Sequence, residues 1–253
     1  ILEQPYGMVL VTGPTGSGKT TTLYAVLKEL NKIEKNIITI EDPVEYKLEG
    51  INQVQINPKA GLTFANGLRS ILRQDPDIIM VGEIRDAETA KIAIRAAITG
   101  HLVLSTLHTN DSPSSVVRLI DMGIEPYLVA SAVIGVVSQR LVKNLCPNCK
   151  VPYEANYSEK SLLGINTEKT ISLYKAKGCN NCNNGYIGRR AIHEVMVVNE
   201  EIRKLINEGA STDELRATAL KCGMTDLLMN SKELALQGIS TLEESLKAGF
   251  TLG

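Results

Sequence analysis

The chain has 253 residues, of which 43% are hydrophobic and 22% are charged, and this balance indicates a globular protein with a sizeable core. Its 27 basic and 28 acidic residues leave a formal net charge of −1, which excludes a chain-wide attraction to nucleic acid or to anionic lipid. Residues 127–137, the longest weakly polar stretch, are too few to cross a bilayer and predict a buried helix. No signal peptide is visible, and because the chain lacks an initiating Met we expect it to be part of a longer protein.

A glycine-rich loop follows the first predicted strand. Residues 8–11 form an apolar strand, residues 13–20 read Gly-Pro-Thr-Gly-Ser-Gly-Lys-Thr, and a helical run comes next. In this strand, loop and helix context, the pattern G-x-x-x-x-G-K-[ST] binds phosphates through backbone N–H groups and the lysine, and Mg²⁺ through the last hydroxyl. The alternative is a plain turn with a surface lysine, which the flanking elements disfavour. The loop therefore predicts a nucleoside triphosphate site, with Thr20 as a magnesium ligand and with these phosphate-binding residues: Gly13, Pro14, Thr15, Gly16, Ser17, Gly18, Lys19, Thr20 and Thr21.

Short Val- and Ile-rich runs alternate with amphipathic helical runs up to about residue 140. Further strands are predicted at 36–40, 77–81 and 102–106. Thr63 and Asp86 stand where they would cap helices, and Gly100 stands where the second of these helices would end. The alternation predicts an α/β fold with a mostly parallel sheet that helices cover on both faces.

Acidic residues follow two of the predicted strands, at the sheet edge where ligands of parallel sheets bind. Glu83 is the first candidate to orient the water that attacks the γ-phosphate. The Asp that often precedes such a glutamate is replaced by Gly82, so we expect Glu41 and, with less support, Glu45 to act on the magnesium ion through bound waters. Asp77 begins its strand and is expected at the opposite edge. The alternative for these acids is a role as helix caps or solvated loop charges.

Two histidines flank the strand at 102–106. His108 follows it, where it could donate to the γ-phosphate or report its loss, whereas His101 precedes it and is expected to be structural or at a subunit contact. The seven residues between their positions correspond to roughly 20 Å of strand, so the two cannot serve the same phosphate. Several arginines are available to neutralise charge on the transferred phosphoryl group, and spacing does not choose among Arg85, Arg95, Arg118 and Arg140.

Two Cys-x-x-Cys pairs lie in a segment of weak periodicity. Cys146 and Cys149 form the first pair, and Cys179 and Cys182 form the second. Four thiolates on two tight turns match a structural Zn²⁺ site, whose binding energy folds a segment too small for its own core. Disulfides or redox chemistry are the alternative. Cys222 is expected to be a small buried residue.

From residue 199 onward the pattern is helical, with capping-box sequences at 211–214 and 241–244. We therefore expect three parts. Residues 1–143 are expected to form the nucleotide-binding core, residues 144–190 a tetracysteine zinc module, and residues 191–253 a mainly helical C-terminal subdomain.

The chain resembles the ATPase region of the type II secretion and type IV pilus assembly ATPases, over nearly all of its length. The resemblance rests on the phosphate loop at 11–24, an acidic box at 40–45, an atypical Walker B segment at 73–86 and a histidine box at 99–110. It implies a RecA-like P-loop core with ATP, Mg²⁺ and Zn²⁺ as cofactors, Glu83 as the catalytic glutamate, Glu41 in the acidic box, and functional roles for both His101 and His108.

The same resemblance implies a cytoplasmic homo-hexamer at the inner face of the cytoplasmic membrane. Members of this family work against an inner-membrane platform protein, and an N-terminal domain, missing from this chain, supplies arginines to the nucleotide site. The tetracysteine segment favours a motor for pilus assembly or secretion over a retraction ATPase, which generally lacks it.

Two other classes of function remain open. A nucleic-acid translocase would use the zinc ribbon to grip DNA or RNA, but the acidic residues of that segment and the near-neutral chain weaken this reading, so we expect no direct contact with nucleic acid. A scaffold would hold ATP without turnover.

Overall fold

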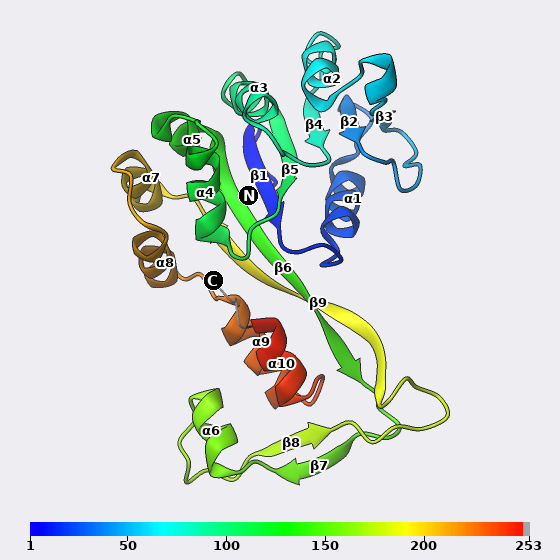
Figure 1. The fold of residues 1–253 in the computed structure, drawn as a ribbon, viewed down its shortest axis with the longest axis vertical. Coiled ribbons are helices and arrows are strands. Elements are labelled where there is room, and N and C mark those ends of the chain that lie inside the picture. The colour runs from blue at the N-terminus through cyan, green and yellow to red at the C-terminus, as the bar shows by residue number, and fades with distance from the viewer. Residues whose placement is uncertain (250–253) are drawn as a thin grey trace. The chain divides into compact units, whose positions relative to one another are not determined.

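The computed structural model describes residues 1–249 (Figure 1). The chain packs into two compact units, the first made of Ile1–Ser138 and Val195–Met224 and the second of Gln139–Glu194 with the described part of Thr225–Gly253. The division into 1–143, 144–190 and 191–253 that the sequence suggests stays a prediction. Residues 250–253 of the last part lie outside the described residues.

The first unit is built on a parallel sheet. Its chain order is β1 (Gly7–Thr12), α1 (Lys19–Leu30), β2 (Ile37–Glu41), β3 (Asn52–Gln55), α2 (Phe64–Ile71), β4 (Ile78–Val81), α3 (Ala87–Ile98), β5 (Leu102–Leu107), α4 (Ser112–Asp121), α5 (Pro126–Ala132) and β6 (Val133–Leu145). With β9 (Tyr186–Val197), the sheet order is β3-β2-β4-β5-β1-β6-β9, and the pairing is parallel from β3 through to β6. The mixed α/β fold with a parallel sheet is therefore confirmed.

Helices bury both faces of this sheet because alternate residues of each strand point to opposite sides. On β1, Val9 and Val11 pack against Leu27 and its neighbours on α1. Met8 and Leu10 face the other way, into a larger cluster that includes residues of α2, α3, α4 and α5. This two-sided burial holds the carboxyl ends of the strands, and the loops that follow them, in fixed positions.

Local signals for helix ends are confirmed. The side chain of Thr63 accepts a hydrogen bond from the Asn66 N–H at the start of α2, and Asp86 accepts one from the Thr89 N–H at the start of α3. Gly100 has φ 117°, a backbone conformation that suits glycine.

The segment 127–137, expected to be one buried helix, is not one. Helix α5 ends at Ala132, and β6 begins at Val133. Four of the five residues at 133–137 are Val or Ile, and such β-branched residues favour a strand where a partner is available, which β1 provides. A window of apolar residues without clear periodicity concealed the change from helix to strand.

The second unit contains β7 (Val151–Glu154), α6 (Tyr157–Leu163), β8 (Ser172–Lys175), α9 (Leu227–Leu236) and α10 (Leu242–Gly249). Strands β7 and β8 form an antiparallel ribbon. The unit has two small apolar clusters, one around Leu173 and Ala235 and one around Ile192 and Leu227. So little burial contributes only modestly to stability.

Strand β9 (Tyr186–Val197) leads from the second unit back to the first, where α7 (Glu200–Asn207) and α8 (Thr212–Lys221) follow. Ser211 and Glu214 form the expected capping box on α8. Cys222, expected to be buried, is exposed at the end of α8, because the helix ends there. Among residues 1–249, none of the helices has the length and apolar character that crossing a bilayer requires.

Candidate nucleotide and metal sites

The loop between β1 and α1 has the backbone of an anion-binding turn. Gly13, Gly16 and Gly18 have φ angles of 140°, 80° and 87°, which residues with a side chain rarely adopt. Helix α1 begins at its Gly18 N-cap without a capping side-chain hydrogen bond from the described residues, so its first N–H groups face the loop. Positions 14–16 are exposed, and the Lys19 Nζ donates hydrogen bonds to the backbone carbonyls of Gly13 at 2.9 Å and Pro14 at 3.2 Å. The loop can thus accept a phosphate chain from solvent.

Lys19 also interacts electrostatically with Glu83. Partial burial lowers the pKa of the Lys19 ammonium, and the charge of Glu83 acts in the opposite direction. The loop after β4 therefore lies close enough to the phosphate loop for the charge of Glu83 to act on Lys19.

Glu83 and His108 are brought together. Glu83 lies between β4 and α3 with its side chain 12% exposed, and its Oε2 is 3.5 Å from the Nε2 of His108. Its Oε1 forms an ion pair with the Nη2 of Arg85 at 2.6 Å, and this hydrogen bond raises the pKa of the Arg85 guanidinium. Arg85, one of the four arginines that spacing left equal, therefore contacts this carboxylate.

Glu41 ends β2 and is 2% exposed. Its carboxylate accepts hydrogen bonds from the Tyr24 hydroxyl, from the Thr39 hydroxyl and, at 3.2 Å, from the Gln53 amide. Three neutral donors thus compensate for the burial of this side chain. Glu45 differs from Glu41, because its side chain is exposed and its backbone N–H makes the contact, donating to the Tyr24 hydroxyl at 3.2 Å.

Gly82 brings the end of β4 close to the strand that carries Glu41, because its N–H donates a hydrogen bond to the Ile40 carbonyl at 2.8 Å. A Cβ atom on Gly82 would lie 3.3 Å from both the Cα of Glu41 and the carbonyl oxygen of Ile40. A side chain at position 82 would therefore crowd the backbone that carries Glu41. The acid missing from one strand end is present on the adjacent strand.

The oxygen donors fit a magnesium ion. Thr20 lies in the first turn of α1 with a hydroxyl, and Glu41 adds a carboxylate at the carboxyl end of β2. Hydroxyl and carboxylate oxygens are the ligands that Mg²⁺ takes, often through water. Both residues belong to the compact first unit, so the donor set is consistent with the expected ion.

The four cysteines of the second unit form one cluster. Their sulfur atoms all lie within 4.8 Å of one another. The Sγ atoms of Cys146 and Cys179 are 3.9 Å apart, those of Cys149 and Cys182 are 3.7 Å apart, and those of Cys179 and Cys182 are 3.6 Å apart. Four sulfurs at about 2.3 Å from a tetrahedral Zn²⁺ are separated by about 3.8 Å, so the cluster has the size of a zinc site.

Backbone donors favour the thiolate of Cys182, whereas burial raises the pKa of the Cys149 thiol to about 12. The N–H groups of Cys179 and Gly185 point at the Cys182 sulfur from 3.2 and 3.3 Å. Burial raises the pKa of the Cys182 thiol, but these N–H donors lower it, and the result is a pKa of about 7. The four cysteines are free thiols rather than disulfides, which is the state that binds metal.

His101 stands apart from this chemistry. It precedes β5, whereas His108 follows the strand, and its Nδ1 is 3.0 Å from the Ala96 carbonyl oxygen. Asp77 likewise precedes β4, where its carboxylate accepts a hydrogen bond from the Asn36 N–H and pairs with Lys35. Both residues lie at the amino ends of their strands, as their positions in the sequence predicted.

Sequence reasoning missed Tyr24 and Gln53, which hold Glu41. Tyr24 lies four residues after Thr20 on α1, so helical periodicity places the two on one face, and that spacing was an available signal. Gln53 belongs to β3, a short strand that the sequence did not predict. No local signal marks it.

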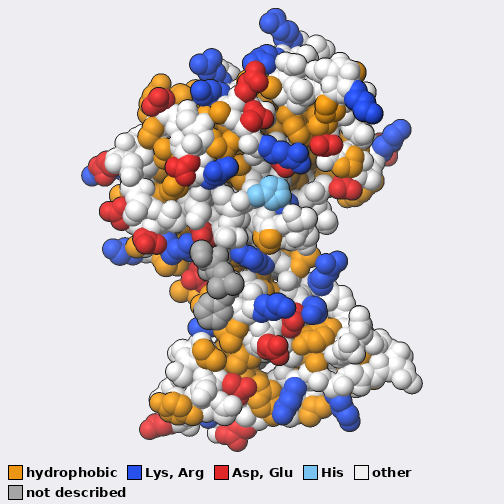
Figure 2. Space-filling model, viewed as in Figure 1, with side chains coloured by type: hydrophobic (Ala, Val, Ile, Leu, Met, Phe, Trp, Pro, Cys, Tyr) orange, Lys and Arg blue, Asp and Glu red, His pale blue; other side chains and the backbone are white. Residues whose placement is uncertain are grey.

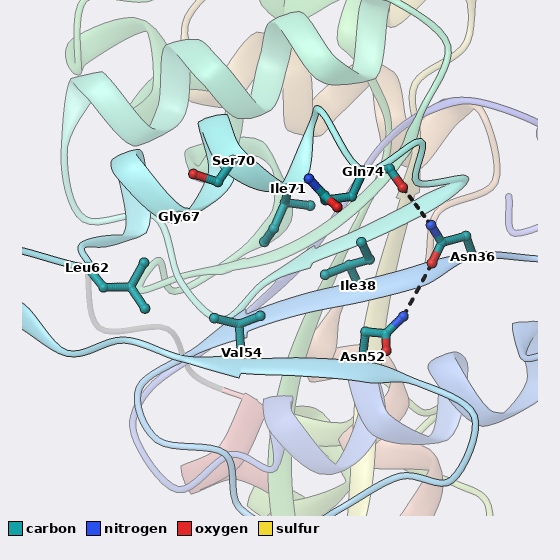
Figure 3. Close-up of a pocket in the computed structure, with 9 residues that line it drawn as sticks. All are labelled: Asn36, Ile38, Asn52, Val54, Leu62, Gly67, Ser70, Ile71 and Gln74. Carbon is teal, nitrogen blue, oxygen red and sulfur yellow. Dashed lines mark hydrogen bonds between the residues drawn. The ribbon is translucent and has the colours of Figure 1, made fainter.

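A pocket outside this site lies between β2, β3 and α2 (Figure 3). Its apolar floor includes Ile38, Val54 and Ile71, and amide side chains of Asn36 and Asn52 line one end. Asn36 precedes β2 and Asn52 begins β3, so these amides lie at the opposite end of the strands from Glu41. The pocket is separate from the candidate nucleotide site.

Comparison with known proteins gives consistent results. The sequence model of a family described as "Type II/IV secretion system protein" matches residues 1–247. The chain is 50% identical to the type II secretion system ATPase E of Vibrio cholerae, over 98% of this chain and 49% of that protein. It is 54% identical to the type IV pilus assembly ATPase PilB of Myxococcus xanthus, over 96% of this chain and 44% of that protein. The chain thus spans about half the length of these relatives.

Among solved structures, the chain is similar to the pilus retraction motor PilT with bound ADP. The TM-score is 0.75 and the identity is 31%, over 99% of this chain and 63% of the PilT chain. The DotB ATPase of Legionella pneumophila is also similar, with a TM-score of 0.69 and 26% identity over 96% of this chain and 60% of the DotB chain. The parallel-sheet fold is therefore that of known ATPases.

Proposed function

The chain belongs to the type II/IV secretion system protein family, and we propose that it is the ATP-hydrolysing part of a motor that powers type IV pilus assembly or type II protein secretion. One observation within the chain carries the proposal. Glu83, most of it buried, lies beside His108 and within electrostatic reach of Lys19. An acid, an imidazole and a phosphate-loop lysine from three separate loops can together bind a triphosphate and orient the attacking water.

The residues divide the chemistry between them. Residues 13–21 bind the triphosphate through backbone N–H groups and the Lys19 ammonium. Glu83 orients a water molecule toward the γ-phosphorus and accepts its proton, the bond to the β,γ-bridging oxygen breaks, and the products are ADP and phosphate. His108 donates a hydrogen bond to the γ-phosphate. Thr20 and, through bound waters, Glu41 would hold Mg²⁺, which would neutralise negative charge on the phosphates.

The architecture that goes with this function has three parts. Residues 1–143 form a RecA-like P-loop core, residues 144–190 a module folded by Zn²⁺ on its four cysteines, and residues 191–253 a mainly helical C-terminal subdomain. The working assembly is a cytoplasmic homo-hexamer at the inner face of the cytoplasmic membrane, which acts against a platform protein there. An N-terminal domain of the same protein completes the nucleotide site with arginines.

A nucleic-acid translocase is less well supported. The rings of Tyr153 and Tyr174, which could stack on bases, each have a lysine ammonium over one face, from Lys175 at 4.8 Å and Lys150 at 4.5 Å. Figure 2 shows basic and acidic side chains intermingled on the displayed face rather than gathered into a basic groove. A retraction motor is less well supported because the named relatives with about half of their residues identical are secretion and pilus assembly ATPases.

Phosphate release by the full-length protein tests the proposal. Glu83→Gln should lower kcat by about a hundredfold or more while ATP still binds, because general-base catalysis contributes about 10²–10⁴. Lys19→Ala should abolish tight ATP binding. Glu88→Gln is the matched control, because Glu88 is an exposed acid on α3 that pairs with Arg69 and should leave kcat unchanged.

Equal rates for the wild type and Glu83→Gln would reject the role of Glu83. A wild type that binds ATP with negligible turnover would favour a scaffold. Undiminished ATP affinity in Lys19→Ala would contradict the phosphate-loop assignment.

A further inference from the structure

The hydroxyl of Tyr24 joins three parts of the first unit. Tyr24 is fully buried on α1, and its hydroxyl donates a hydrogen bond to Oε2 of Glu41 on β2. The same oxygen accepts hydrogen bonds from the Glu45 N–H at 3.2 Å and from the Gln53 amide on β3 at 3.3 Å. A phenol has one donor and two acceptor sites, so every site on this hydroxyl is used.

Packing alone does not require this hydroxyl. The Tyr24 ring lies in the cluster formed by α1 and β1, and it meets the Tyr46 ring edge-on with centroids 4.7 Å apart. A phenylalanine would supply the same apolar contacts. Burying a hydroxyl costs free energy unless it is hydrogen-bonded, and the three hydrogen bonds of Tyr24 offset this cost. Burial and the bond to Glu41 raise the pKa of Tyr24 to about 12, so it remains a donor at any physiological pH.

The helix that carries Tyr24 also carries the phosphate-binding end of the loop. Lys19 and Thr20 open α1, and Tyr24 lies one turn after Thr20 on the same face. On its other side, the Ile40 carbonyl next to Glu41 accepts a hydrogen bond at 2.8 Å from the N–H of Gly82, which precedes Glu83. Glu41 is therefore held between the phosphate-loop helix and the strand that leads to Glu83.

We infer that Tyr24 is a positioning residue, whose hydroxyl fixes the acidic segment 41–45 to helix α1 so that Glu41 keeps its place when phosphates bind the loop. Tyr24 acts through Glu41 and touches neither nucleotide nor metal. The inference rests on the proposed function, because it gives Tyr24 a part in ATP hydrolysis. The Tyr24 hydroxyl thus connects helix α1, which begins in the phosphate loop, to the acidic segment 41–45.

The first test needs neither nucleotide nor metal. In the full-length protein, Tyr24→Phe removes the acceptor of the Glu45 N–H, so hydrogen exchange at residues 44–46 should become about tenfold faster, while exchange at 19–24 stays within twofold. Tyr46→Phe is the matched control, because Tyr46 contacts the same ring while Glu41 takes its hydrogen bonds from Tyr24, Thr39 and Gln53. It should leave exchange at 44–46 unchanged.

The second test asks whether Tyr24 works through Glu41. Tyr24→Phe should lower kcat about tenfold to a hundredfold with ATP affinity within about twofold, as expected for a lost hydrogen bond to a charged group. In a Glu41→Gln background the same substitution should lower kcat by less than about twofold, because residues that act as a unit are not additive.

Unchanged exchange at 44–46 in Tyr24→Phe, or an equal loss of kcat in both backgrounds, would overturn the inference. If Tyr24→Phe does not fold, Gln53→Met cuts the network from β3, where Gln53 also accepts the Leu48 N–H at 2.7 Å. It should speed exchange at Leu48 and lower kcat, and failure of both would overturn the inference equally. A wild type without turnover would refute the proposed function, while the exchange test would still decide whether Tyr24 fixes the segment.

Discussion

An ion pair between α4 and α8 fixes the segment that carries His108. Asp111 caps α4, with Oδ1 accepting the Ser114 N–H at 2.8 Å and Oδ2 at 2.9 Å from the Nη2 of Arg216 on α8. The Asp111 side chain is 8% exposed and that of Arg216 is 29% exposed. Only two residues, Thr109 and Asn110, separate His108 from Asp111, so loss of the pair should loosen both α4 and the loop before it.

The magnitude follows from the exposure of the two side chains. Removing one partner of a fully buried pair costs about 3–5 kcal/mol, and an exposed pair contributes about 0–1 kcal/mol. Arg216 is partly exposed, so we expect Arg216→Met to lower the free energy of unfolding by about 1–3 kcal/mol. Asp111→Ala also removes the helix cap, which adds about 1 kcal/mol. The double variant should be less destabilised than the sum, with a coupling of about 1–2 kcal/mol.

Urea unfolding of the wild type, the two single variants and the double variant measures this coupling. Arg69→Met is the matched control, because Arg69 pairs with Glu88 at 2.6 Å but both side chains are at least half exposed. It should cost less than about 1 kcal/mol. Additive losses at Asp111 and Arg216, or a loss at Arg216 no larger than at Arg69, would refute the reasoning.

Two predictions concern the second unit. Cys146→Ser should release zinc and open residues 144–190 to protease, because the metal supplies folding energy that the small apolar clusters lack. The control Cys222→Ser, at an exposed cysteine outside the cluster, should retain one zinc per chain. Metal analysis and proteolysis measure both effects, and an unchanged digest after verified zinc loss would contradict the prediction. Burial lowers the pKa of His193 below its ordinary 6.5, so the unfolded chain takes up a proton that the folded chain resists, and stability present above pH 6.5 is lost as the pH falls through the folded pKa. The free energy of unfolding should therefore fall less between pH 7.5 and pH 5.5 in His193→Gln than in the wild type, and equal losses would show that His193 is not the group responsible.

The sequence predicted those features of the first unit that depend on a few consecutive residues, such as the phosphate loop and the helix caps. The glycines at 13, 16 and 18 adopt the left-handed angles that their spacing suggests, and Thr63 and Asp86 cap their helices. These features depend on neighbours within a few residues, which a sequence displays directly. The meeting of Glu83 and His108 needed one further step, the rule that parallel strands end at a common edge.

Features set by distant partners were not predictable in the same way. The strand that begins at Val133 depends on β1, more than a hundred residues earlier, and the short strand that contains Gln53 depends on β2. The hydrogen bonds from Tyr24 and Gln53 to Glu41 join segments that only the folded sheet brings together.

The central claim is that groups from separate strand ends surround one bound triphosphate. A crystal structure of the full-length protein with Mg²⁺ and a non-hydrolysable ATP analogue tests this most directly. The account predicts the β- and γ-phosphates in the loop at 13–20, with the Glu83 carboxylate and the His108 imidazole facing the γ-phosphate. A nucleotide bound elsewhere, with Glu83 remote from its terminal phosphate, would contradict the account.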